Sequence, residues 1–249
     1  MVIKTKHITS AIIAMTIHPV ASQVTTTISS QKESVVHLSL ASDVVSQYIW
    51  RGQDLGDLSL QPTIGIEYKG LSLTGWSSVG LTDPADTKEF DLTLAYTLGG
   101  LNIGVTDYWT NNGGDPAARY FKYDTHCTNH IFEANIGYDF DVVNVQWFTN
   151  FAGNDGVNKD GKRAYSSYVE VVVPFNFATV DCTATAGAVP FATDYYGTSG
   201  FAVTNLSLRV EKAIKITDSF SIPVFGQVIA NPCSQKAYPV FGLTLEPNI

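Results

Sequence analysis

Apolar and polar residues alternate with a period of two along most of this chain, and no other feature constrains its fold as strongly. In residues 89–98 every even position is apolar and every odd position is polar or small. Successive side chains of a strand point to opposite faces, so this segment has one apolar and one polar face. About twelve segments share the pattern. We expect strands at Val36–Trp50, Leu60–Tyr68, Leu71–Leu81, Glu89–Leu98, Leu101–Trp109, His130–Phe140, Val143–Phe151, Ala164–Phe175, Thr179–Val189, Phe201–Ile214, Ser219–Ile229 and Ala237–Leu245.

The lengths of these segments and of their connections predict an all-β fold, a closed antiparallel transmembrane β-barrel with up-and-down topology. Most segments have about 9–12 residues, close to the roughly 9–11 of a tilted membrane strand and above the roughly 5–6 usual in soluble proteins. Short turns such as Lys69–Gly70 and Gly99–Gly100 alternate with longer connections such as Thr110–Asn129. Bacterial barrels likewise alternate short periplasmic turns with longer extracellular loops and have an even strand number, here about 12. A soluble β-sandwich with one buried face is the alternative.

The N-terminus has the layout of a secretory signal peptide. Two lysines precede a mostly apolar run over residues 8–17, and small residues follow it. The run is about ten residues long, too short for the roughly 20 of a membrane-spanning helix, and a buried N-terminal helix is the alternative. We expect three parts: a cleaved signal peptide (residues 1–22), a periplasmic tail (residues 23–35) and the barrel (residues 36–249).

Charge and cysteine content exclude several classes of function. Without Lys4 and Lys6 the 15 basic residues fall to 13, against 23 acidic ones, which leaves a net charge of −10. Nucleic-acid binding needs a basic face, so we expect no such partner. Cys127, Cys182 and Cys233 are too few for a disulfide scaffold, and their spacing matches no metal motif. A bridge between Cys127 and Cys233 stays open, and we expect no metal or cofactor.

If the apolar faces contact lipid, the polar faces line a lumen. The charged residues expected there are eight acids and two bases: Asp43, Glu67, Glu89, Asp91, Glu133, Glu170, Asp181, Glu211, Arg51 and Arg209. Rings of acidic side chains favour the passage of cations. The alternative is that these charges pair with one another or are solvated without selecting ions. Arg51 is expected either to pair with an acid across the lumen or to lie at a constriction and contact solutes.

The end of the first predicted strand resembles a known family. Residues 46–52 read SQYIWRG, which is similar to the S-D-Y-x-aromatic-R-G signature of the TorF-like porin family, with Gln47 in place of the usual acid. Further similar segments are residues 60–62, 65–68, 71–76 and 90–93. The resemblance covers most of the chain after the signal peptide. It implies a closed barrel in the outer membrane of a Gram-negative bacterium, with channel activity.

The sequence favours a porin-like channel for ions or small polar solutes, with a preference for cations. Side chains fill barrels of about 8 strands, whereas about 16–18 strands enclose an aqueous channel, so about 12 predict a narrow pore. The expected partners are outer-membrane lipid and the solutes. One alternative is a barrel enzyme acting on lipid, since His126 and His130 flank the long loop, although no G-x-S-x-G motif occurs. The other is a closed structural or adhesion barrel. In such a barrel the loop residues Tyr120, Phe121 and Tyr123 bind partners. Alternatively, in a channel, the same loop folds inward and narrows the pore.

Overall fold

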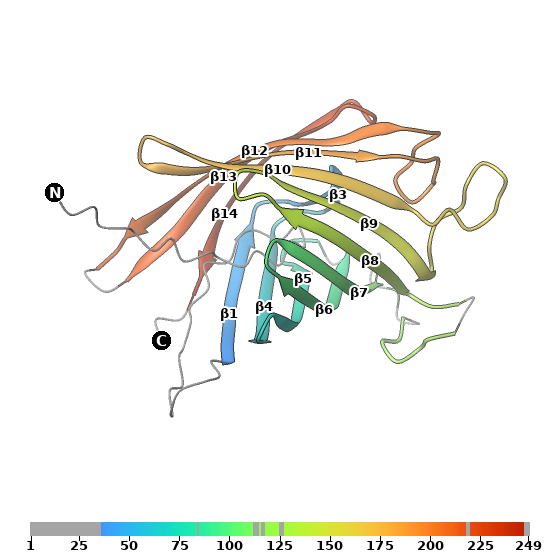
Figure 1. Ribbon diagram of the computed structural model, residues 1–249, viewed down its shortest axis with the longest axis horizontal. Helices are drawn as coiled ribbons and strands as arrows, with labels where there is room; N and C mark the ends of the chain where they lie inside the picture. The colour runs from blue at the N-terminus through green and yellow to red at the C-terminus, as the bar shows by residue number, and fades with distance from the viewer. Residues whose placement is uncertain are drawn as a thin grey trace.

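The computed structural model describes residues 36–83, 85–111, 115, 118–124, 127–217 and 220–246. The expected signal peptide (residues 1–22), the expected periplasmic tail (residues 23–35) and His126 lie outside the described residues. Within the described ranges, twelve strands form a closed antiparallel barrel and two more form a separate hairpin (Figure 1). The predicted fold class, an all-β closed barrel of about twelve strands, is therefore confirmed.

Each wall strand pairs with its neighbours in chain order, and the first pairs with the last to close the barrel. The wall strands are β1 (Val36–Val45), β4 (Ser59–Tyr68), β5 (Leu71–Gly80), β6 (Lys88–Leu98), β7 (Leu101–Asn111), β8 (His130–Asp139), β9 (Asn144–Gly153), β10 (Ser167–Phe177), β11 (Val180–Val189), β12 (Ala202–Lys215), β13 (Ser221–Asn231) and β14 (Lys236–Leu245). The separate hairpin consists of β2 (Tyr48–Trp50) and β3 (Gln53–Gly56).

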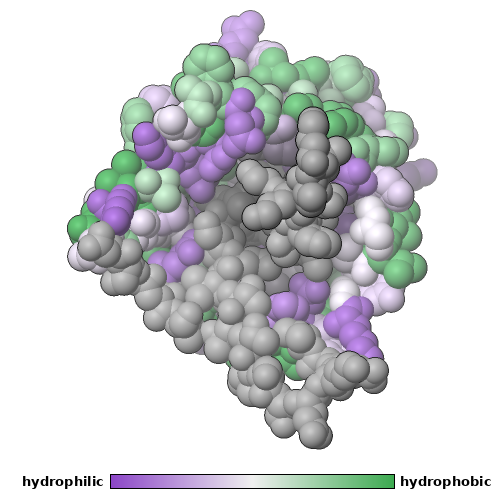
Figure 2. Space-filling view, turned by 60° about the vertical axis from the view of Figure 1, so that its left-hand side comes forward, coloured by the Kyte–Doolittle hydropathy of each residue, from purple (hydrophilic) through white to green (hydrophobic). Residues whose placement is uncertain are grey.

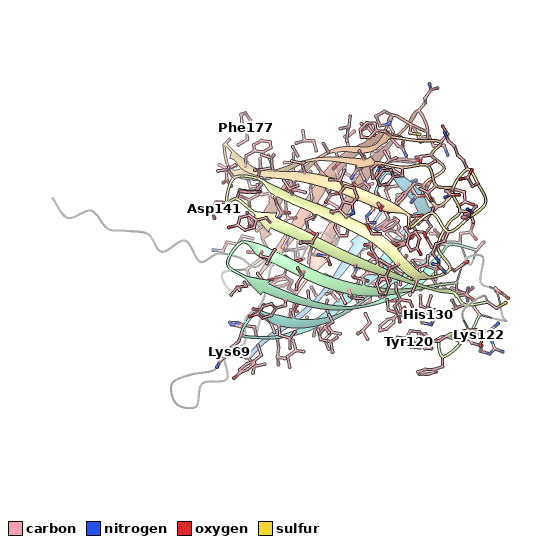
Figure 3. The ribbon with its side chains drawn as sticks, turned by 45° about the vertical axis from the view of Figure 1, so that its right-hand side comes forward. Lys69, Tyr120, Lys122, His130, Asp141 and Phe177 are labelled. Carbon is pink, nitrogen blue, oxygen red and sulfur yellow. The ribbon has the colours of Figure 1, made fainter. Side chains whose placement is uncertain are left out.

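Short and long connections lie at opposite ends of the barrel. Lys69 and Gly70 join β4 to β5 with φ values of 50° and 83°. Positive φ at both central residues is the geometry of the two-residue turns that match the twist of a hairpin. In Figure 3, Lys69, Asp141 and Phe177 mark this short-turn end, whereas Tyr120, Lys122 and His130 lie at the opposite, long-loop end.

The outer wall of the barrel is apolar and the inner wall is polar. In β6, Leu94 and Leu98 point outward with 52% and 64% of their surface exposed, whereas the inward-facing Asp91 is 1% exposed. In Figure 2, hydrophobic residues gather around the outside of the wall and hydrophilic residues lie toward the mouth at the short-turn end. Soluble monomers rarely expose contiguous apolar patches above a few hundred Å². So extensive an apolar surface is typical of a wall that contacts lipid.

The first predicted strand, Val36–Trp50, is wrong in its second half. β1 ends at Val45, and residues 46–58, the plug hairpin, leave the wall and enter the interior. Alternation continues through Tyr48 and Trp50 because both lie in a strand, but that strand belongs to the internal hairpin. Each of these two side chains is only 6% exposed. The segment that resembles the TorF-like signature therefore lies in the plug hairpin.

Candidate functional site

The plug hairpin fills the long-loop half of the barrel interior. Trp50 stacks on Tyr196, from the loop between β11 and β12, with ring centroids 5.9 Å apart. At the hairpin tip, Nδ2 of Asn231 on β13 donates a hydrogen bond to the Gly52 carbonyl at 3.0 Å. The hairpin therefore extends from the end of β1 to the wall at β13. The buried cluster around it comprises Tyr48, Trp50, Trp76, Tyr108, Ile131, Phe148, Tyr168, Val189 and Tyr196.

The short-turn half of the interior is a vestibule that remains accessible. Inward-facing residues in this half, such as Glu67, Thr97 and Glu211, are partly exposed. The inward-facing residues next to the plug hairpin are buried instead. The long-loop half is therefore filled, whereas the vestibule is exposed in part, since its inward-facing Asn102 and Asn144 are only 8% and 6% exposed.

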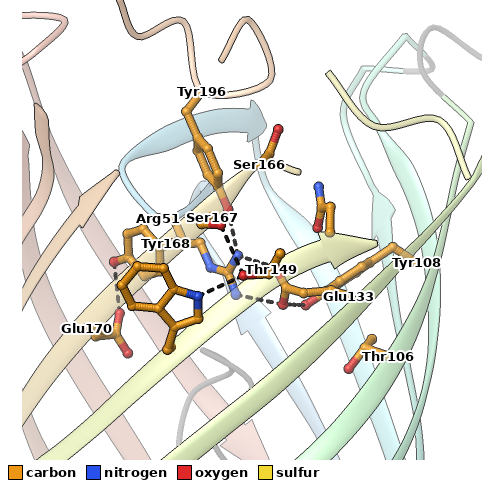
Figure 4. Close-up of polar contacts among 12 residues, drawn as sticks. Arg51, Thr106, Tyr108, Glu133, Thr149, Ser166, Ser167, Tyr168, Glu170 and Tyr196 are labelled. Carbon is orange, nitrogen blue, oxygen red and sulfur yellow. Dashed lines mark hydrogen bonds and ion pairs between the residues drawn. The ribbon is translucent and has the colours of Figure 1, made fainter. Parts of the chain in front are cut away.

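Arg51, at the tip of the plug hairpin, forms a two-point ion pair with Glu133 on β8. Its Nη1 and Nη2 donate to the two carboxylate oxygens at 2.5 and 2.9 Å (Figure 4). Nη1 also donates to the Tyr196 hydroxyl at 2.6 Å. Burial raises the pKa of Tyr196 well above its ordinary value, so its hydroxyl stays neutral and can accept this bond. Of the two alternatives for Arg51, the structure shows pairing with an acid across the lumen.

Aromatic rings surround the same guanidinium group. The guanidinium carbon of Arg51, Cζ, lies 4.4, 4.2 and 4.6 Å from the ring centroids of Trp50, Phe148 and Tyr168. Arg51 is 2% exposed. A desolvated cation over an aromatic face gains about 2 kcal/mol or more. The guanidinium is also hydrated more weakly than an ammonium, which makes arginine the basic residue best suited to such burial.

Three buried tyrosines donate hydrogen bonds to three buried glutamates around the plug hairpin. Each bond is 2.9 Å long, and the pairs are Tyr48–Glu89, Tyr108–Glu133 and Tyr168–Glu170. Each tyrosine brings an apolar ring into the cluster and a hydroxyl that satisfies a carboxylate, so acids can be kept in an aromatic interior. Glu133 receives both a tyrosine hydroxyl and the Arg51 guanidinium.

The ten charged residues expected in the lumen are divided between two environments. Arg51 in the plug hairpin and the four acids around it are all buried: Glu89, Asp91, Glu133 and Glu170. Elsewhere, Arg209 pairs with Glu211 at 2.7 Å, and the buried Asp43 accepts a hydrogen bond from Thr244 at 2.6 Å. Glu67 and Asp181 lie near the short-turn end and are more accessible to solvent. Many of these charges are thus satisfied within the barrel, as the pairing alternative expects.

Sequence reasoning missed the aromatic residues that complete the site. Phe148 and Tyr168 stand on the otherwise polar, inward faces of β9 and β10, where they are 2% and 0% exposed. Large aromatic side chains on a lumen-facing side are the signal that something apolar fills that part of the lumen. Tyr195 and Tyr196 lie in a loop and carry no comparable signal.

The described part of the long loop between β7 and β8 lies on the outside of the wall. Tyr120 packs edge-to-face on Phe90 and Trp109, which point outward, and Tyr123 stacks on His130 with ring centroids 4.0 Å apart. Of the two alternatives for these loop residues, the structure does not show the one in which they fold inward and narrow the pore. The outward aromatic residues at the rim of the barrel offer the loop a packing surface, and residues 46–58 already occupy the lumen.

The cysteines are free, and no disulfide joins Cys127 to Cys233. Cys182 is buried in β11. In the part of the chain that the structure describes, no group of three or more His, Cys, Asp or Glu side chains is arranged to hold a metal ion. Among the same residues, no helix is long and apolar enough to cross a membrane. No family model and no curated protein sequence matches this chain.

Proposed function

We propose that this protein is an outer-membrane channel of the porin type, which passes ions or small polar solutes and prefers cations. The observation that carries the proposal is the closed twelve-strand barrel with an apolar outer face and a polar, mainly acidic inner face. In lipid every backbone group needs an internal partner, and a closed barrel provides one because it has no open edge. The expected signal peptide and the resemblance to the TorF-like family support the same location.

The plug hairpin limits what this channel passes. Arg51 and the aromatic rings around it fill the long-loop half, whereas inward-facing residues of the vestibule such as Glu67 and Glu211 are partly exposed. Solutes therefore need the plug hairpin to move, or they follow a narrow path along its side. The charges around the plug hairpin, with four carboxyl groups and one guanidinium, favour cations on either path.

Planar-bilayer recording of the purified barrel tests the channel. We expect small conductance steps for the wild type, and a reversal potential in a salt gradient that indicates cation preference. A variant with residues 46–58 replaced by a short Asn-Gly turn is expected to give larger steps. As a matched control, shortening the exposed loop at residues 158–162 in the same way leaves the step size unchanged. If neither the wild type nor the hairpin-less variant conducts at any voltage, the channel proposal is wrong.

The filled half of the lumen favours a second candidate, a closed structural or adhesion barrel. Under this alternative only the hairpin-less variant conducts. A lipid hydrolase has less support, because His130, its described histidine candidate, has both ring nitrogens engaged. Nδ1 lies 2.7 Å from Oδ1 of Asp107 and Nε2 lies 2.5 Å from the Tyr120 carbonyl oxygen. Alanine at His126 and His130, combined with a lipase assay, tests the hydrolase.

A further inference from the structure

We propose that the wall pocket around Glu133 is a binding site for guanidinium groups, which Arg51 of the plug hairpin occupies as a tethered ligand. The free ligand is then a small solute that carries a guanidinium group. The inference names a solute class for the proposed channel, and it depends on that function only for the access of solutes to the lumen.

The pocket belongs to the barrel, whereas its occupant belongs to the plug hairpin. Glu133, Phe148 and Tyr168 lie on β8, β9 and β10, where β9 pairs with β10 on one side and, across a register shift between Phe132 and Glu133, with β8 on the other. Tyr108 on the neighbouring β7 donates to Oε1 of Glu133 and orients its carboxylate. These side chains are held by the wall, so we expect the pocket to persist when the plug hairpin moves away.

The geometry of the pocket fits a guanidinium and not an ammonium. Two hydrogen bonds, of 2.5 and 2.9 Å, join Nη1 and Nη2 to the two oxygens of Glu133. The rings of Phe148 and Tyr168 lie 4.2 and 4.6 Å from Cζ of Arg51. A planar group with forked donors uses the carboxylate and the rings at once, whereas an ammonium acts as a point charge.

The tether holds Arg51 at a conformational cost. Arg51 and Gly52 have φ values of 49° and 79°, as in a two-residue turn whose first position favours Asn, Asp or Gly. A longer L side chain is disfavoured there, so the contacts of the pocket offset strain in the backbone. The Nε atom of Arg51 is buried without a hydrogen-bond partner among the described residues. A free guanidinium solute has neither constraint.

The plug hairpin has few bonds of its own to resist displacement. β2 and β3 form a two-stranded sheet of three residue pairs, separate from the barrel ladder. Such a small sheet is at most marginally stable alone. Backbone hydrogen bonds to neighbouring segments are made at residues 46, 55 and 58, away from the tip. The position of the tip therefore depends on side-chain contacts, those of Arg51 and the bond from Asn231 to the Gly52 carbonyl.

Emptying the pocket in the full chain tests the proposal. Arg51→Ala is purified as a folded barrel, and its melting temperature is followed with millimolar methylguanidinium, or with methylammonium at equal concentration. We expect a saturable rise with methylguanidinium alone. The double variant Arg51→Ala, Glu133→Gln is expected not to respond. Arg209→Ala is the matched control, because it removes a second guanidinium that contacts one ring and a partly exposed acid.

The proposal is overturned if Arg51→Ala folds but its melting temperature does not rise with methylguanidinium. It is also overturned if the melting temperature of Arg209→Ala rises equally. If Arg51→Ala does not fold, Arg51→Lys decides in the same way, because it keeps the positive charge but leaves the two-point site unfilled. The outcome is separable from the channel proposal. If the barrel does not conduct, a measured rise in melting temperature with methylguanidinium still shows binding. If the melting temperature does not change, the conductance measurements still stand.

Discussion

Replacing each partner of the buried ion pair by an uncharged residue tests whether Arg51 and Glu133 hold the plug hairpin in the lumen. Both side chains are 2% exposed, and their closest atoms are 2.5 Å apart. Removing one partner of such a pair costs about 3–5 kcal/mol, because the other charge is left buried without compensation. We therefore expect Glu133→Gln and Arg51→Met each to lower the free energy of unfolding.

The loss of unfolding free energy in each variant depends on which contacts the remaining charged residue keeps. In Glu133→Gln, Arg51 keeps the Tyr196 hydroxyl and three aromatic rings, so we expect the lower end, about 3 kcal/mol. In Arg51→Met, Glu133 keeps only the Tyr108 hydroxyl among the side chains described here, so we expect the upper end, about 5 kcal/mol. Because the double variant leaves neither charge buried, it should cost about 2–3 kcal/mol less than the sum of the single variants.

Urea titration of the four proteins in lipid vesicles, under reversible conditions, gives the unfolding free energies. β2 and β3 of the plug hairpin pair only with each other and not with the wall strands, so part of each loss is local, and hydrogen exchange of residues 48–56 measures that part. Exchange should be faster in both single variants than in the wild type. If the two costs add within about 0.5 kcal/mol, Arg51 and Glu133 do not act as a pair, and our account of how the plug hairpin is held is refuted.

Three further outcomes follow from the wall and its ends. Leu94→Arg, on the outer face, should lower the free energy of unfolding in vesicles by about 2–4 kcal/mol, and an unchanged value would contradict a lipid-facing wall. Gly187→Ala places a Cβ 1.8 Å from the Tyr168 hydroxyl and should cost about 1–3 kcal/mol, whereas Gly200→Ala meets no atom within 4 Å and should be near neutral. On intact cells, a membrane-impermeant maleimide should label the exposed cysteines of the long-loop end, Cys127 and Cys233. Labelling only after lysis would reverse the expected orientation.

The wall of this barrel could be predicted from the sequence because its determinants are local. Alternation with a period of two is a property of neighbouring residues, and β6 (Lys88–Leu98) differs from its predicted range, Glu89–Leu98, by one residue. The turn at Lys69–Gly70 is likewise encoded by adjacent residues. In a closed barrel each wall strand forms its backbone hydrogen bonds with the wall strands next to it along the chain. These local signals were therefore enough to define the whole wall.

The plug hairpin and its pocket were decided only by the tertiary structure. The segment Tyr48–Trp50 alternates like a wall strand, and only the partners of its side chains place it in the lumen. Arg51 binds Glu133, 82 residues away, and Tyr196, 145 residues away. These contacts form when the closed wall brings distant strands around one volume, and that volume must then be filled. The inward-facing Phe148 and Tyr168 signal that something apolar fills the lumen, but which segment fills it and which charges pair depend on the assembled barrel.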